Sequence, residues 1–141
     1  EEGSWTPALV GLSNTPNFYN NFGRYTKIGR VCTVQFFAQT AGSPNPTFTT
    51  ATDVFKISGL PFSVDGHGYT GSQGSLSAQS FNFNGSNNTY GVTGQVSPSV
   101  NSSEQMEFQV TASGGIRGQV KNSGQTSGFV IEATVTYFTL D

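Results

Sequence analysis

Apolar and polar residues alternate along much of the chain with a period of two, most clearly in residues 30–40 and 129–139. Successive side chains of a β-strand point to opposite faces, so we predict that both segments are strands with one buried face. In residues 30–40 the predicted buried face holds Cys32, Val34, Phe36 and Ala38, and the polar face holds Thr33, Gln35 and Gln39. In residues 129–139 the buried face holds Phe129, Ile131, Ala133, Val135 and Tyr137, opposite Glu132, Thr134 and Thr136.

Five further segments alternate less regularly and are predicted to be shorter strands. No segment keeps a helical period of 3.6 residues for more than a turn or two. The predicted strands are residues 53–58, 75–83, 89–96, 104–112 and 115–120, separated by clusters of Gly, Asn, Ser and Pro. This spacing predicts an all-β fold, an antiparallel β-sandwich of jelly-roll type in which two sheets cover each other's apolar faces. A closed barrel is the alternative.

The segments between these strands are long, polar and rich in aromatic residues, unlike minimal hairpin turns. They are predicted as loops over residues 14–21, 40–50, 65–74 and 84–89. Decorated loops on a rigid β scaffold are common places for recognition.

Composition restricts the class of partner. The 141 residues make one domain, 10% of them are charged and the net charge is −2. Such a surface lacks the positive field that attracts nucleic acid or anionic lipid, and no apolar run approaches the roughly 20 residues that span a bilayer. Twelve Phe supply core area that offsets chain entropy. The chain has no initiator Met, which suggests a piece of a longer protein.

A small polar cluster in residues 58–70 contains the only histidine, His67, with Asp65 and Tyr69 two residues away on either side. In an extended loop this spacing places an acceptor, a titratable donor and an aromatic ring on one side, a combination that suits a sugar. The same residues also fit a glycine-rich turn with a solvated histidine. Amides and a ring at Asn84, Asn87, Asn88 and Tyr90 leave the same two interpretations open.

Metal and catalytic sites are not predicted. One His and one Cys cannot form a zinc site, and no loop carries the alternating acidic ligands of a calcium site. His67 lies between two glycines, where no neighbour fixes its tautomer. Glu104 and Glu107 are three apart on a predicted strand, so they point to opposite faces. Cys32 lies in an apolar run and is predicted to be buried. An active site shared between subunits stays open.

Four blocks of the sequence are the most distinctive: EEGSWTPALVG at the start, FGRYTKIGRVCTVQFF, KISGLPFSVDG, and IEATVTYFT near the end. In order and spacing they resemble a domain that recurs in bacteriophage tail fibres and tailspikes. Residues 63–127 match no pattern of that domain. The blocks also read as scaffold: Trp5 and Pro7 tie the first strand to the core, Gly29 makes a tight turn, Pro61 ends a strand, and Phe62 fills the sandwich edge.

The resemblance implies a single C-terminal β-sandwich domain, residues 1–141, of a longer fibre or tailspike protein. It further implies a homotrimer at the end of a fibre, on the outside of the virion, in contact with the bacterial surface.

Our leading hypothesis is therefore receptor binding, in which the trimer binds host surface polysaccharide without catalysis and without a cofactor. Nucleic acid and membrane insertion are not expected. The predicted contact residues are Tyr69, His67, Asp65, Tyr90, Asn88, Tyr19 and Asn20. The first rival is a purely structural trimerisation domain with no ligand, and the second is a glycan-cleaving enzyme; in such architectures glycan cleavage generally belongs to an upstream domain.

Overall fold

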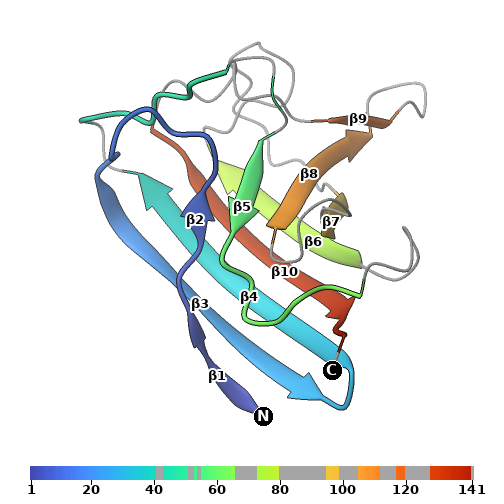
Figure 1. The fold of residues 1–141 in the computed structure, drawn as a ribbon. Helices are drawn as coiled ribbons and strands as arrows, with labels where there is room; N and C mark the ends of the chain where they lie inside the picture. The colour runs from blue at the N-terminus through green and yellow to red at the C-terminus, as the bar shows by residue number, and fades with distance from the viewer. Residues whose placement is uncertain are drawn as a thin grey trace.

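The computed structural model describes residues 1–40, 43–50, 53, 55–65, 73–79, 95–98, 105–111, 117–119 and 128–140. Every strand pair in this part of the chain is antiparallel, and the strands form two sheets (Figure 1). The predicted all-β antiparallel fold is confirmed.

The first sheet contains the longest strands. Its order is β1 (Glu2–Trp5), β3 (Phe18–Ile28), β4 (Val31–Thr40), β10 (Val130–Phe138) and β6 (Gln73–Gln79). The C-terminal strand β10 therefore lies inside the sheet, paired on one side with β4 and on the other with β6.

The second sheet is built from short strands and covers part of one face of the first (Figure 1). Its order is β2 (Ala8–Leu9), β5 (Lys56–Ser58), β8 (Gln105–Thr111) and β7 (Gln95–Pro98), with β9 (Arg117–Gln119) also paired to β8.

The core lies between the two sheets and is centred on Phe55, which is fully buried beside β5. Its ring makes edge contacts with Phe108 of β8 at 5.3 Å and with Phe129, next to β10, at 5.8 Å. Aromatic pairs at such distances add about 0.5–1.5 kcal/mol each beyond the area they bury. Phe55 thus joins the two sheets directly.

Two of the three long strands, β4 and β10, are those predicted from the alternation. All nine predicted apolar positions in residues 30–40 and 129–139 are buried. The five shorter predicted segments each overlap a strand, from β5 to β9 in turn, although residues 89–96 share only Gln95 and Val96 with β7.

The prediction of a loop over residues 14–21 is wrong from Phe18 onward, because β3 begins there and pairs with β4 along its length. The inward positions of β3 include Asn21, Gly23 and Lys27, so the strand lacks the apolar alternation of its neighbours. Aromatic side chains of β1 and of β3 itself supply the apolar cover that these positions lack.

Two glycines and two aromatic rings face each other across the β1–β3 pair. Gly3 is the register partner of Tyr25, and Trp5 is the register partner of Gly23. A Cβ at Gly3 would lie 2.6 Å from the Tyr25 hydroxyl oxygen, and one at Gly23 would lie 2.3 Å from Trp5 Nε1. Each ring therefore occupies the space that a glycine leaves open. This reciprocal packing explains why Gly-x-Trp occurs in the first block and Gly-x-Tyr in the second.

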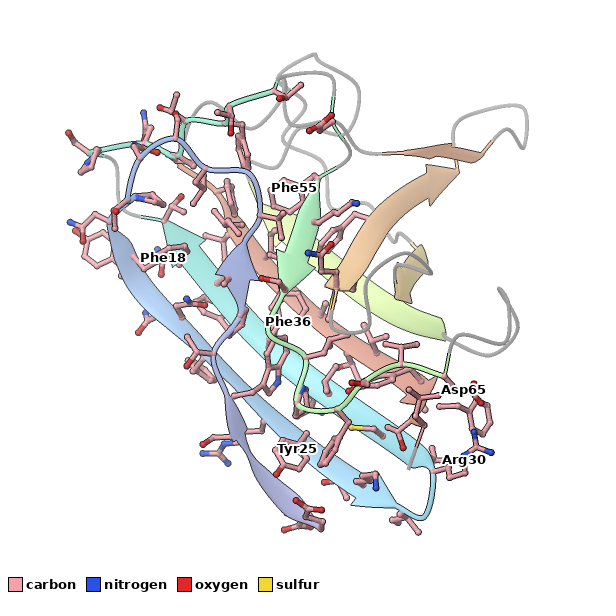
Figure 2. The ribbon with its side chains drawn as sticks, viewed as in Figure 1. Phe18, Tyr25, Arg30, Phe36, Phe55 and Asp65 are labelled. Carbon is pink, nitrogen blue, oxygen red and sulfur yellow. The ribbon has the colours of Figure 1, made fainter. Side chains whose placement is uncertain are left out.

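The β3–β4 turn and the segment after β5 also take their predicted structural roles. Gly29 lies in the left-handed region, with φ of 58°, and forms the two-residue turn with Arg30. After β5, Phe62 packs edge-on against Tyr25 at 5.2 Å, and its carbonyl accepts a hydrogen bond from the Tyr137 hydroxyl. This segment covers the end of the first sheet that β5 and β8 leave open (Figure 2).

Candidate functional site

Four of the seven predicted contact residues, His67, Tyr69, Asn88 and Tyr90, lie outside the described residues. The same is true of Asn84 and Asn87. Their assignment as ligand contacts stays a prediction.

Asp65 is held at the end of the first sheet that carries the β3–β4 turn (Figure 2). Its backbone N–H donates to the Phe138 carbonyl at 2.8 Å, and its carboxylate forms an ion pair with Arg30. Arg30 also donates through Nε to the Thr139 carbonyl at 3.0 Å. The Asp65 side chain is therefore partnered, which gives it a structural role at this sheet end.

Tyr19 and Asn20 lie at the opposite end of β3. Asn20 pairs with Gln39, whereas Ile28 pairs with Val31 beside the turn that contacts Asp65. Eight residues of strand separate the two ends, or roughly 25 Å. The register shifts between Phe18 and Asn20, so Tyr19 occupies a bulge, and 72% of its side chain is exposed. The structure does not bring Asp65 together with these two residues.

A second group of side chains gathers on the side of the first sheet that faces away from the second sheet, here called the outer face. Tyr25 and Phe36 lie on the side that carries β5 (Figure 2), so the alternate residues of β3, β4 and β10 point the other way. These outer-face residues are Asn20, Phe22, Arg24 and Thr26 of β3, Thr33, Gln35, Phe37 and Gln39 of β4, and Glu132, Thr134 and Thr136 of β10.

The outer face contains a stacked aromatic pair. Phe22 and Phe37 are cross-strand partners whose ring centroids lie 5.9 Å apart with planes 21° from parallel. Phe22 is 54% exposed. Two large apolar rings stacked at the surface among polar side chains form an exposed apolar patch, and such patches commonly mark binding sites.

Two shallow hollows are lined by side chains of the outer face, and the first of them includes this pair. The first, of about 200 Å³, is lined by Phe22, Arg24, Gln35, Phe36, Phe37, Glu132, Ala133 and Thr134. The second, of about 430 Å³, is lined by Glu2, Gly3, Arg24, Tyr25, Thr26 and Gln35. Arg24 and Gln35 line both, so the hollows adjoin across β3 and β4.

The polar side chains of the first hollow can all form hydrogen bonds with a ligand. Arg24 offers donors, Glu132 offers acceptors, and Gln35 and Thr134 offer both. Within the described part of the chain, none of these four side chains has a hydrogen-bond or ion-pair partner. The hollow therefore combines an apolar platform with uncommitted polar groups, which suits a ligand that presents both C–H faces and hydroxyls.

Exposed apolar side chains gather at the turn end of the first sheet, here called the apolar end. They are Ile28, Val31, Phe138 and Leu140, with Ile28 77% exposed. Ile28, Val31 and Phe138 are neighbours by strand register across β3, β4 and β10.

Two titratable groups on the inner side of the first sheet, Cys32 and Tyr25, have shifted pKa values. Burial raises the pKa of the Cys32 thiol, which is fully buried as predicted. Partial burial and then the Glu1 carboxylate raise the pKa of Tyr25, whose hydroxyl donates to Glu1 Oε1 at 3.3 Å. Neither group belongs to the outer face.

Among the described residues, no group of three or more His, Cys, Asp and Glu side chains is placed to hold a metal ion. The same residues include no helix with the length and apolarity needed to cross a membrane.

The outer-face site was missed by the sequence analysis, although one signal was present. In the alternation of residues 30–40, Phe37 falls on the same face as Thr33, Gln35 and Gln39. A large apolar residue on an otherwise polar strand face marks an exposed ring. Its partner Phe22 could not be placed, because β3 was not predicted as a strand.

Comparison with known proteins finds a similar structure. The crystal structure of Dettilon tailspike protein (gp208) is similar to 99% of this chain, with a TM-score of 0.64 and 14% sequence identity. This chain covers 24% of that tailspike chain. No family model matches the sequence, and no curated protein matches it. The resemblance stated from the sequence is therefore confirmed for the fold.

Proposed function

We propose that this chain is a non-catalytic domain of a phage tail fibre or tailspike that forms homotrimers and binds polysaccharide on the surface of the bacterial host. The observation that carries the proposal is the match of nearly the whole chain to part of a tailspike protein. The four sequence blocks support it independently of that structural match.

Polysaccharide binding is supported by the chemistry of the exposed surface. A glycan presents hydroxyls for hydrogen bonds and C–H faces for aromatic rings, and the outer face offers partners for both. The low charge content gives little attraction to nucleic acid or anionic lipid. Single sugar sites are weak, and three copies on one fibre would bind a repeating polymer with much higher avidity.

Trimer formation is supported by the apolar end. Apolar side chains exposed together are commonly covered by another chain. Closed symmetric assembly would also cover the edges of the sheets, which otherwise offer unpaired backbone groups to other proteins.

The absence of catalysis is part of the proposal. Among the acidic residues that the structure describes, Asp65 is in an ion pair with Arg30. Glu132 is exposed on an open sheet face, where water has free access to its carboxylate. A glycosidase would instead need two facing carboxylates across a sugar.

The alternative is a purely structural domain that holds three chains in register and has no ligand. The apolar end favours this role as much as it favours a trimer that binds glycans. The two functions differ in what loop and surface variants would do to phage adsorption.

The proposal is tested by measuring the mass of the purified chain by light scattering and, on the same sample, its binding to host cells and to isolated surface polysaccharide. A trimer that binds polysaccharide supports the proposal. A trimer that binds no polysaccharide favours the structural alternative, and a stable monomer contradicts the fibre assignment.

A further inference from the structure

We infer that the outer face of the first sheet is a binding site for a neutral oligosaccharide, with Phe22 and Phe37 as the platform on which a sugar ring stacks. The inference rests on the proposed function, and it assigns polysaccharide binding to a sheet face that the loop-based sequence prediction did not include.

The platform is suited to a sugar ring by its geometry. The two phenyl rings lie in adjacent strands and are stacked, with centroids 5.9 Å apart and planes 21° from parallel, so their edges and outward ring faces form one apolar patch. The C–H face of a pyranose can cover such a surface and remove apolar area from water. Phe22 is exposed enough for the contact, and its neighbour Phe37 is half-buried and therefore held in place.

The groups around the platform match the rim of a sugar. Glu132 is the partner of Phe37 on β10, on the side away from Phe22. Two residues along the strands, Arg24, Gln35 and Thr134 are paired in the same way. A carboxylate can accept from two vicinal hydroxyls, whereas the guanidinium and amide can donate to hydroxyl oxygens. These side chains have no partner among the described residues, so a ligand would not have to break existing bonds to engage them.

The charges favour a neutral ligand over an acidic one. Arg24 lines both hollows, with Glu132 in the first and Glu2 in the second. One positive and two negative groups leave no local field that would attract a polyanion. The same arrangement predicts that binding depends little on salt.

The adjoining hollows indicate more than one sugar unit. Because Arg24 and Gln35 line both, a ligand stacked on Phe22 and Phe37 could continue across β3 towards Glu2 and Thr26. A disaccharide or longer segment would use both hollows, whereas a monosaccharide would fill only one.

The site is rigid because it is built on the centre of the sheet. β3, β4 and β10 are paired along almost their whole length, and the Thr33 and Thr136 hydroxyls share a hydrogen bond of 2.9 Å next to the site. A preformed site loses less entropy on binding than a loop that must be ordered first.

The experiment compares the unaltered chain with Phe37→Ser, Glu132→Gln and the control Thr6→Ala, which removes an exposed hydroxyl between β1 and β2, away from the outer face and the apolar end. Each protein is applied to an array of bacterial oligosaccharides of one to six sugars, neutral and acidic, at 0.05 and 0.5 M NaCl. Light scattering and circular dichroism on every sample report assembly and folding.

We expect neutral oligosaccharides of two or more sugars to bind, with an affinity that changes less than about twofold between the two salt concentrations. Phe37→Ser should weaken binding about tenfold or more, the equivalent of one lost contact of about 1.4 kcal/mol. Glu132→Gln, which keeps the size of the side chain and one of its oxygens, should weaken it less, and Thr6→Ala should leave it unchanged.

Other outcomes overturn the inference in ways that separate it from the proposed function. Glycan binding that survives Phe37→Ser and Glu132→Gln would place the site elsewhere and leave the proposed function standing. Binding confined to acidic glycans would contradict the neutral ligand. A change of solution mass in Phe37→Ser would identify the outer face as a contact between copies. A folded trimer that binds no glycan would overturn the inference and the receptor-binding function together.

Discussion

The indole of Trp5 lies over Gly23, its partner across the β1–β3 pair, and the space that a Cβ would need at Gly23 is filled by the ring. Tyr25 covers Gly3 in the same way two pairs along the ladder. Trp5 is buried and makes an edge contact with Phe36 of β4 at 5.7 Å. The first strand is thus fixed to the sheet by side-chain packing as well as by its backbone hydrogen bonds.

Gly23→Ala should destabilise the fold by about 1–3 kcal/mol, because the new methyl overlaps the indole of Trp5. Denaturant unfolding measures the change. Gly29→Ala is the control: nothing lies within 4 Å of its Cβ position, so only the positive φ matters and the cost should be near 1 kcal/mol. In a chain that already carries Trp5→Ala, the added Gly23→Ala should lower the free energy of unfolding only slightly further, because the indole is no longer there to be displaced. Equal cost in both backgrounds would show that the indole is not the obstacle.

Thr40→Val should lower the free energy of unfolding by about 1–3 kcal/mol, although valine has nearly the same shape as threonine. The buried Thr40 hydroxyl accepts a hydrogen bond from the Phe129 N–H at 2.8 Å, and the valine methyl cannot replace it. Thr33→Val, on the half-exposed outer face, is the comparison and should change the unfolding free energy by less than about 0.5 kcal/mol. Similar values for the two variants would contradict the role of the Thr40 hydroxyl.

β4 and β10, in which the inward-facing residues from Cys32 to Ala38 and from Ile131 to Tyr137 are all apolar, could be predicted from the sequence, whereas β3 could not. For β4 and β10 the apolar periodicity follows directly from burial against the second sheet. At Gly23 the apolar cover comes from a partner more than a dozen residues away in sequence, so the strand itself carries glycine where a core residue would be expected. Periodicity detects a buried face only where the strand supplies its own apolar side chains.

The stability of the fold should fall as the pH rises above about 8.5, the usual pKa of a free thiol. Burial raises the pKa of Cys32 in the folded state, so the folded protein holds the thiol proton more tightly than the unfolded chain. The stabilisation is complete at lower pH and is lost at up to about 1.4 kcal/mol per pH unit once the unfolded thiol ionises. Unfolding between pH 7 and 9.5, below the titration of tyrosine, measures it.

Cys32→Ala is the control for this prediction. It should lower stability at every pH because it leaves a small cavity, but it should flatten the decline above pH 8.5. A decline that persists unchanged in Cys32→Ala would assign the effect to another group.

Asp65→Asn should destabilise the fold by less than about 1 kcal/mol, because the Arg30 side chain is 57% exposed and water competes for the ion pair. Arg30→Ala should cost somewhat more, since it also removes the donor to the Thr139 carbonyl. Thermal unfolding at 0.05 and 0.5 M NaCl separates the two contributions, because only the ion pair is screened. A cost well above 1 kcal/mol for Asp65→Asn would contradict this view of the pair.

The candidate site illustrates a different limit of the sequence. Polar and aromatic residues in long loops predicted recognition there, but Phe22 and Phe37 become neighbours only through the register of β3 with β4. The two-residue turn at Gly29 and Arg30 fixes that register, because it pairs Ile28 with Val31 and hence, six residues further along each strand, Phe22 with Phe37. Once β3 is known to be a strand, the aromatic pair can be predicted by counting alone.

The position of β10 between β4 and β6 also sets the order of events during synthesis. The β3–β4 hairpin is translated before β10, so the edge of β4 that β10 covers in the fold lacks this partner until β10 has been translated. Through that interval each nascent chain exposes unpaired backbone and half of an apolar core. Neighbouring ribosomes on one messenger RNA hold several such open edges close together. The time until β10 is translated then sets how long this edge of β4 is open to pairing with another chain.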